Sequence, residues 1–495
     1  MAWQSGGMRR PGPLATCLSL AALAGAASAR WLGPPADFDL RNYHIYDGMA
    51  VLHGRIGIDI APAQLQSFYA PALDALYALL LGGLNRHPLL LGAALALQQG
   101  LAAFLVFRLA ARMLPDGPAR GAIAAAAALA GVTGAAGAST LGGPMSEMLP
   151  ACCLLGALLA FARPAWSGVL AGVAIGLKLT FAPFAVGLAL AARLAPRFVA
   201  GAAAGAALAA GWWWAWLGYR YGNPIFPYFN DLIGSPWGAR LSGIDTRFFP
   251  HGLAETLFYP LFWSFRASRL ASEAPARDPR VLIGWIAALW LIARRPGPRL
   301  RPMLWVWGVG YVLWEAVFSI LRYLLTLELL APVLVAASFA PLLARARPRV
   351  AVALSWALAL AVIAATIPPD WGHAPPGSRA VAVRAPDFSP GTLVVLLDWS
   401  PMSYVAAFAP RSVQFVGGEN NLVVAGAPDL LSRAVAAAIA GQRGPIWGLA
   451  RDAVVADRAL RAYGLARAGT CVRVRSNLDR DAIRACPLRR IAAGR

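Results

Sequence analysis

The chain has 495 residues, of which 59% are hydrophobic and only 14% are charged, against about 25% charged in ordinary globular proteins. This composition excludes a chain built only of soluble globular domains and indicates a protein that lies mostly in a membrane. The formal net charge of +21 is compatible with nucleic-acid binding, but no recognised nucleic-acid-binding motif accompanies it. The arginines instead gather in short segments between apolar runs, as in loops held on the cytoplasmic side of a membrane. We therefore expect a lipid bilayer, and no nucleic acid, as a partner.

The N-terminal segment has two interpretations. Met8-Arg9-Arg10 precedes an apolar run that ends at Ala27-Ser28-Ala29, a pattern typical of a cleavable signal peptide. The same run fits a first transmembrane helix over residues 12–30, which we favour. Both interpretations place the long segment 31–87 outside.

Two later segments decide the topology. Residues 71–84 are apolar but short, and a crossing here would leave the arginines at 108 and 112 outside. We therefore expect a helix that lies in the outer interface. Segment 166–192 has Lys178 in its middle and crosses either once or as two half-spans that meet outside near that lysine. We choose the half-spans, because they keep the arginines at 193 and 197 inside.

The remaining pattern predicts a second long outer loop over residues 218–279 and about eleven crossings in all. Residues 1–367 would form this transmembrane domain. The more polar tail, 368–495, would be a small α/β domain outside the membrane. The fold class is therefore an α-helical polytopic membrane protein with a C-terminal extracytoplasmic α/β domain.

Three stretches support the α/β prediction for the tail. Residues 392–398 and 413–417 are typical of buried strands, and residues 429–440 have apolar positions at helical spacing. The tail also contains Cys471 and Cys486. In an oxidising compartment these two cysteines are expected to form a disulfide.

Acidic residues just after the first span are the strongest candidates for chemistry. Asp37-Phe38-Asp39 is followed by Tyr43 and His44. Two carboxylates at this spacing can hold a divalent cation such as Mg²⁺ or Mn²⁺, or one of them can act as a base. The alternative is a solvated loop beside a helix end.

Ionisable residues at membrane depth are costly and often functional. Lys178, the only lysine of the chain, is flanked by apolar residues, and Arg322-Tyr323 precedes another apolar run. Both cations also fit the role of interfacial anchors. Glu147 opens a further apolar run, whereas Arg266, Glu273 and Asp278 lie in the second outer loop.

The order of several motifs resembles that of the C-type membrane glycosyltransferases, which include lipid A aminoarabinose transferases, protein mannosyltransferases and oligosaccharyltransferase catalytic subunits. Five motifs of this chain are similar to motifs of the family and occur in the same order. They are the Asp-Phe-Asp triplet followed by Tyr43, Ala50 and Gly54; Phe68-Tyr69-Ala70-Pro71; Glu147; Gly172 through Thr180; and Leu321-Arg322-Tyr323-Leu324. This chain departs from the family in having Asp-Phe-Asp for the usual Asp-Glu pair and glutamate at 147 for the commoner aspartate.

The resemblance implies transfer of a sugar from a polyprenyl-phosphate donor to a lipid or glycan acceptor, at the outer face of a bacterial cytoplasmic membrane. Asp39 would be the catalytic carboxylate, assisted by Asp37 or Glu147, and a metal held by the two aspartates is one option. Lys178 and Arg322 would neutralise the donor phosphate. Other substrate-binding candidates are Tyr323, Tyr43, His44, Arg266, Glu273 and Asp278.

Two other classes of function compete with this one. A transporter or flippase of a lipid-linked or anionic solute explains many crossings and intramembrane charge, but transporters usually contain internal repeats, and none is detectable here. A non-catalytic membrane scaffold that displays the tail domain leaves the clustered outer charges unexplained.

Overall fold

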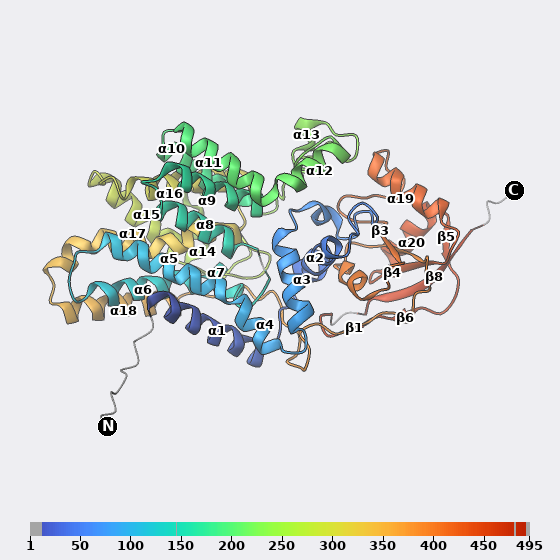
Figure 1. The fold of residues 1–495 in the computed structure, drawn as a ribbon, viewed down its shortest axis with the longest axis horizontal. Coiled ribbons are helices and arrows are strands. Elements are labelled where there is room, and N and C mark those ends of the chain that lie inside the picture. Colours follow the sequence, from blue (N-terminus) through green and yellow to red (C-terminus); the bar gives the residue numbers. More distant parts are fainter. Residues whose placement is uncertain (1–11, 145, 480–481, 492–495) are drawn as a thin grey trace, which may run out of the picture.

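The computed structural model describes residues 12–144, 146–479 and 482–491; the arginines at 9 and 10 lie outside them. The chain is about 58% helical. Figure 1 shows a bundle of helices at one end and a small strand-containing region, built from the C-terminal residues, at the other. The helices α2 (Ile45–Leu52) and α3 (Ala72–Leu84) lie between these two parts.

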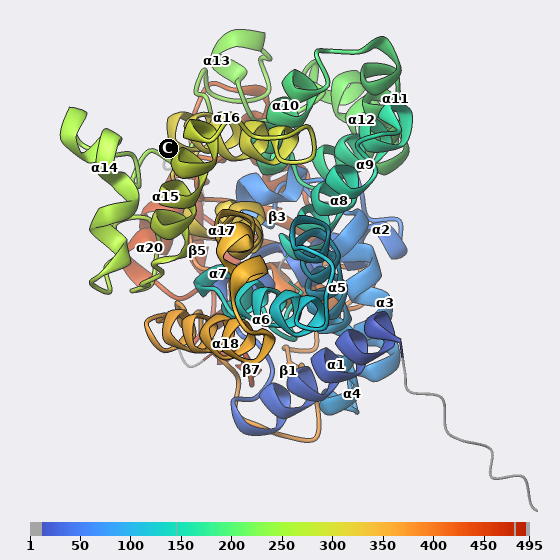
Figure 2. The ribbon, with the colours of Figure 1, turned by 90° about the vertical axis from the view of Figure 1, so that its left-hand side faces the viewer.

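Among the residues that the structure describes, four helical segments are long and apolar enough to cross a membrane. They coincide with four of the spans that hydropathy predicts, and Figure 2 views the bundle that they help to form end-on. The four segments are α1 (Pro13–Trp31); Pro88–Met113, formed by α4 (Pro88–Leu95) and α5 (Leu97–Met113); Pro196–Tyr221, formed by α11 (Pro196–Ala206), a π-helical turn and α12 (Trp212–Tyr221); and Leu321–Arg345, formed by the 3₁₀ turn η5 (Leu321–Leu324) and α17 (Leu325–Arg345).

The structure does not support about eleven crossings. The other helices of the bundle have only 10–17 residues, and the 12 residues of α8 (Met148–Leu159) reach about 18 Å, against a hydrocarbon core of ~30 Å. Hydropathy alone does not separate these short apolar helices from full spans. These shorter helices are α6 (Arg120–Val132), α8, α9 (Pro164–Leu177), α10 (Ala182–Ala191), α15 (Arg280–Ala293), α16 (Arg301–Val317) and α18 (Pro348–Ala364).

A helix break at Lys178 separates α9 from α10. Lys178 has extended backbone angles (φ −155°, ψ 115°), and a short 3₁₀ turn, η3 (Leu179–Phe181), leads into α10. Glycines let α9 pack closely on α11: a Cβ atom at Gly172 would lie 1.9 Å from the carbonyl oxygen of Ala202. Small residues of this kind are typical of close helix pairs in membranes. The glycine-rich tract before Lys178 therefore fixes where the lysine stands.

The outer segment between α1 and α4 is folded back on itself. Its helix begins at Phe38, passes through a π-helical turn, η1 (Leu40–His44), and continues as α2. A Cβ atom at Gly48 would lie only 2.1 Å from the backbone oxygen of Asp74, so α3 passes α2 at the distance that only glycine permits. The second outer segment contains the short α13 (Asn230–Ile233) and α14 (Leu253–Ser264).

The C-terminal region confirms the prediction of strands and helices in the tail. Its main sheet has the order β3-β2-β4-β8-β5, in which β3, β2 and β4 run parallel and β8 runs antiparallel to β4. Two helices, α19 (Leu430–Gly441) and α20 (Ala453–Ala462), follow β3 and β4. The strands are β1 (Val383–Arg384), β2 (Leu393–Leu396), β3 (Gln414–Gly417), β4 (Ile446–Ala450), β5 (Leu465–Arg467), β6 (Val472–Arg473), β7 (Arg475–Ser476) and β8 (Arg484–Arg490).

The C-terminal region is attached to the outer segment by backbone and buried side-chain contacts. Ile60 forms a parallel bridge with Val416 of β3. Arg55 pairs with Asp59 at 2.5 Å and also donates to the backbone oxygen of Val413 at 2.6 Å. The hydroxyl of Ser403 donates to the backbone oxygen of Asn42, inside η1. The C-terminal region therefore helps to hold the segment that carries the candidate carboxylates.

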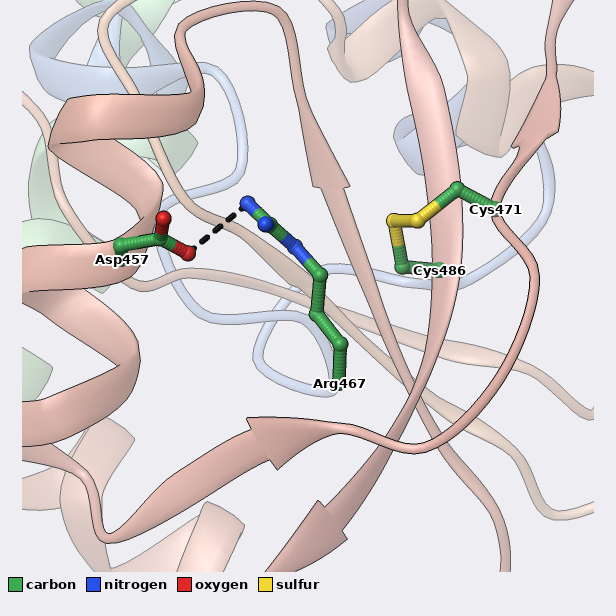
Figure 3. The surroundings of a disulfide bond; sticks show 4 residues. All are labelled: Asp457, Arg467, Cys471 and Cys486. Carbon is green, nitrogen blue, oxygen red and sulfur yellow. Dashed lines mark ion pairs between the residues drawn. A yellow bond between two sulfur atoms is a disulfide. The ribbon is translucent and has the colours of Figure 1, made fainter.

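The predicted disulfide between Cys471 and Cys486 is present (Figure 3). It ties the segment before β6 to β8, beside the ion pair of Asp457 and Arg467. The two cysteines are 15 residues apart.

Removing this disulfide should destabilise the C-terminal region. The change of both cysteines to serine should lower the free energy of unfolding by about 3 kcal/mol, the chain-entropy value for a loop of this length. Thermal unfolding of the detergent-solubilised protein, compared with the wild type with and without reductant, measures the effect. Equal unfolding temperatures in all samples, or two free thiols in unreduced peptides by mass spectrometry, would contradict it.

The charge pattern predicts that the C-terminal region lies outside the membrane. Ser378 and Ser389 are exposed, so Ser378→Cys and Ser389→Cys should react with a membrane-impermeant thiol reagent in intact spheroplasts. Gly297→Cys, in an exposed arginine-rich loop expected inside, is the matched control and should react only after lysis. Reaction of the two serine positions only after lysis would reverse the orientation.

Candidate active site

Arg322 and Asp39 form an ion pair between segments that are 283 residues apart in the chain. Arg322 comes from η5, directly before α17, and Asp39 lies in the first turn of the helix that begins at Phe38. Two further carboxylates approach the same guanidinium: Glu147 Oε1 at 3.9 Å and Glu273 Oε1 at 3.8 Å. Arg322 therefore lies among acidic residues from three different segments.

Lys178 belongs to the same cluster. Its ammonium lies 2.6 Å from Glu147 Oε1 and 2.9 Å from the hydroxyl of Ser146. It also lies 5.5 Å from the centre of the Tyr323 ring, and the Arg322 guanidinium lies 5.1 Å from that ring. Both cations are thus within cation–π distance of the same aromatic ring, that of Tyr323. The break between α9 and α10 is what directs the lysine to this position.

Several polar atoms in this cluster are buried without a hydrogen-bond partner among the described residues. They include Glu147 Oε2, Glu273 Oε2 and Arg322 Nε. Buried polar groups are normally hydrogen-bonded, and exceptions gather at sites that bind something. The cluster thus has both donor and acceptor capacity left for a polar ligand.

The two aspartates of the triplet have different environments. Burial alone would raise the pKa of Asp39, but the charges of Arg322, His44 and Lys178 outweigh it and bring that pKa below its usual value. Burial and the negative charge of Asp39 instead raise the pKa of Asp37. The pKa values of the two neighbouring carboxyls are therefore shifted in opposite directions.

Asp37 has a structural role. Its Oδ1 accepts a hydrogen bond of 2.8 Å from the backbone N–H of Leu40, so it caps the helix that begins at Phe38. Asp39 is engaged by Arg322. Within the described ranges, no group of three or more histidine, cysteine or acidic side chains has the geometry to hold a metal.

A buried histidine–aspartate pair lies beside the cluster. His44 Nδ1 is 2.5 Å from Asp74 Oδ1, and both side chains are buried. The His44 ring is tilted against the Tyr43 ring, with centres 4.1 Å apart, and the Tyr43 hydroxyl lies 3.5 Å from Asp39 Oδ2. Sequence reasoning named Tyr43 and His44 but missed Asp74. The available signal was a lone carboxylate in the first turn of an otherwise apolar helix.

A cavity of about 70 Å³ adjoins the cluster. Its polar lining residues include Lys178, Ser146, Asp74 and four tyrosines. The hydroxyls of two of these tyrosines, Tyr69 and Tyr228, are hydrogen-bonded at 2.6 Å. The tyrosines are Tyr43, Tyr69, Tyr228 and Tyr323, and the apolar lining residues include Leu73, Ile175, Leu177, Trp214, Leu217 and Ile225.

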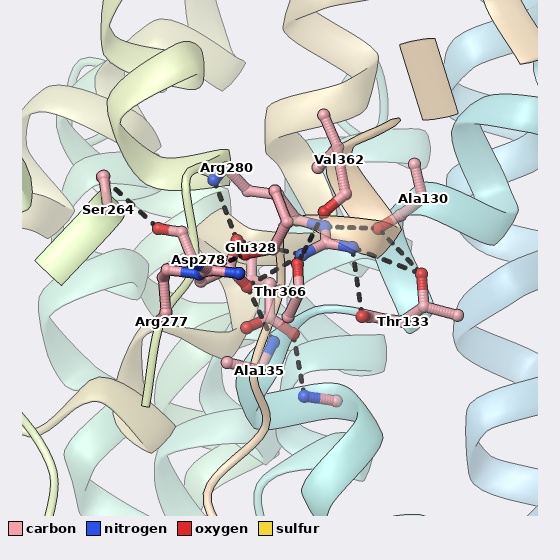
Figure 4. A network of polar contacts seen from close by, with 12 residues as sticks. Ala130, Thr133, Ala135, Ser264, Arg277, Asp278, Arg280, Glu328, Val362 and Thr366 are labelled. Atoms are coloured by element: carbon pink, nitrogen blue, oxygen red, sulfur yellow. Dashed lines mark hydrogen bonds and ion pairs between the residues drawn. The ribbon is translucent and has the colours of Figure 1, made fainter. Parts of the chain in front are cut away.

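Two predicted site residues lie elsewhere. Asp278 belongs to a separate buried network, in which it pairs with Arg280 at 2.9 Å and accepts from the backbone N–H of Ala135 at 2.7 Å (Figure 4). Glu328 accepts from the next two amides of the same turn, at 2.9 and 2.8 Å. Each charged group of this network is paired or hydrogen-bonded within the protein, and the network therefore joins the helices that carry these groups. Arg266 is exposed and is not brought into the cluster.

The chain was compared with protein-family models, with curated proteins and with solved structures, and none of the three comparisons gives a match. The functional argument therefore depends on the residues themselves.

Proposed function

We propose that this protein is a membrane glycosyltransferase that transfers a sugar from a polyprenyl-phosphate donor to a lipid or glycan acceptor. One observation carries the proposal. Four charged residues from separate segments, Asp39, Glu147, Lys178 and Arg322, form a single ion-paired cluster beside a cavity that is lined by both polar and apolar side chains. These are also positions at which the sequence resembles the C-type membrane glycosyltransferases.

The cavity has the chemistry of an amphipathic phosphate. A lipid phosphate presents a charged head beside an isoprenoid chain, and the cavity presents Lys178 and tyrosine hydroxyls beside leucine, isoleucine and tryptophan side chains. Arginine and lysine are the side chains that bind phosphate oxygens in charge-assisted hydrogen bonds. In this proposal the cavity receives the phosphate end of the donor, and the sugar lies toward Asp39.

The chemical step is a displacement at the anomeric carbon. The acceptor oxygen forms the new bond to this carbon while the bond to the phosphate oxygen breaks, and its electron pair leaves with the lipid phosphate. Lys178 and Arg322 stabilise the charge that develops on the leaving phosphate, which is commonly the largest contribution of such a site. Asp39 orients Arg322 and the acceptor group. The site would face the outside of a bacterial cytoplasmic membrane.

Binding of the donor can be tested without measuring transfer. Since Lys178 is the only lysine, an amine-reactive acylating reagent modifies one side chain, which peptide mass spectrometry quantifies. Polyprenyl phosphate should protect Lys178 from acylation, and polyprenol, which lacks the phosphate, should not. Transfer from a polyprenyl-phosphate sugar in proteoliposomes should fall strongly in Lys178→Met. Unchanged acylation in the presence of polyprenyl phosphate would sink the proposal.

Asp39 should be far more important for transfer than Asp37. Asp39→Asn removes the charge that holds Arg322, and misplacement of a catalytic group by about 1 Å can cost on the order of 100-fold in rate. Asp37→Asn is the matched control, because asparagine caps a helix as well as aspartate does, and its rate should stay within about threefold. Proteoliposome transfer rates measure both. A wild-type rate in Asp39→Asn, with normal insertion, would remove the assignment; loss only in Glu147→Gln would move the role to that residue.

A further inference from the structure

Asp74 is a lining residue of the cavity, whereas Asp39 is engaged by Arg322. Asp74 lies in the first turn of α3 and is 3% exposed, yet it lines the same cavity as Lys178. One of its oxygens is 2.5 Å from His44 Nδ1. The geometry points to Asp74 as the group that takes the proton of the acceptor in the proposed transfer, with His44 as its positioning residue. This inference rests on the proposed function and deepens it.

Asp39 and Asp74 differ in their ion-pair partners and in whether they line the cavity. Asp39 Oδ2 is paired with Arg322 and is also 3.5 Å from the Tyr43 hydroxyl. A carboxylate stabilised in this way as an anion has little tendency to accept a proton. Asp74 has no arginine or lysine partner among the ion pairs of the described residues; its partner is a histidine. Asp74 also lines the cavity, whereas Asp39 does not, so Asp74 is the carboxylate that a bound acceptor can reach.

Asp74 is also held in place by its neighbours. A base must stay within hydrogen-bond reach of the proton that it removes. Asp74 is fixed by His44, whose side chain is completely buried, and by the close approach of α3 to α2 at Gly48. His44 itself does not line the cavity, so its contact with the proposed reacting group is through its hydrogen bond to Asp74.

A neighbouring carboxylate provides a built-in comparison. Asp47 lies on α2, is 4% exposed, and lines a different cavity, of about 40 Å³, together with Asp59 and Trp216. Its Oδ2 is buried without a hydrogen-bond partner among the described residues. Burial and the nearby charge of Asp74 raise the pKa of Asp47. Asparagine has nearly the same shape as aspartate, so Asp47→Asn changes a carboxylate at an equally buried position without changing its size.

The proton balance of the step is complete. The acceptor O–H bond breaks as the bond from its oxygen to the anomeric carbon forms, and the proton goes to the free oxygen of Asp74. The bond between the anomeric carbon and the phosphate oxygen breaks at the same time. Asp74 then returns the proton to the lipid phosphate or to water when the products leave.

The test compares Asp74→Asn with Asp47→Asn in proteoliposomes, using a polyprenyl-phosphate sugar as donor. In Asp74→Asn, kcat should fall on the order of 100-fold, while the KM for the donor stays within about threefold. Asp47→Asn should keep kcat within about threefold. Protection of Lys178 from acylation by polyprenyl phosphate should persist in both variants, which shows that the cavity is intact.

The role of His44 has its own readout. His44→Asn keeps an N–H near the position of Nδ1 and should retain more of kcat than His44→Ala, at an unchanged donor KM. An Asp74→Asn protein with protected Lys178 and a wild-type kcat would overturn the inference and leave the proposed function standing. Equal losses in Asp47→Asn and Asp74→Asn would overturn it as well, because they would show a structural role for both. A wild-type protein that neither transfers sugar nor binds polyprenyl phosphate would overturn the proposed function, and the inference with it.

Discussion

The ion pair between Asp39 and Arg322 is the interaction on which the candidate site depends. It joins the outer segment after α1 to the turn before α17, and Glu147 and Glu273 come within 4 Å of the same guanidinium. A buried ion pair contributes little net stability, because desolvation of the charges offsets their attraction. Breaking one is nevertheless costly, since it leaves an unpaired charge. Such a pair specifies one arrangement of the segments that meet there.

The structure supports this arrangement from two directions. On the membrane side, glycines at 168 and 172 let α9 approach α11 closely, and the helix stops at Lys178. On the other side, the C-terminal region contacts the outer segment through Arg55, Ile60 and Asn42. The C-terminal region therefore helps to set the position of the helix that carries Asp39. Loss of the tail would be expected to disturb the site even though no residue of the tail belongs to it.

The two polar networks of the helical part differ in a way that separates structure from chemistry. In the network of Asp278, Arg280 and Glu328, the carboxylates accept hydrogen bonds from backbone amides, and the guanidinium donates to carbonyl and hydroxyl oxygens. In the cluster of Arg322 and Glu147, buried donor and acceptor atoms remain without partners among the described residues. A network that satisfies all of its own groups has no capacity for a ligand, whereas the second cluster does. This contrast is why only the second one carries a functional proposal.

The sequence by itself determined what depends on local chemistry and on composition. Apolar content indicated a membrane protein. Two apolar runs and one stretch with helical spacing located β2, β3 and α19 in the tail, because such patterns reflect which residues of an element are buried. The residue types at 39, 147, 178 and 322 were recognisable, since charges beside apolar runs carry a high desolvation cost. The count of about eleven crossings is not supported, because a short apolar helix has the same hydropathy as a full span and only four described segments have the length of one. Only the tertiary structure decided that Asp39 pairs with Arg322, that Asp278 belongs to another network, and that Asp74 faces the cavity. Those outcomes depend on the crossing of helices far apart in the chain, and a local pattern contains no information on that.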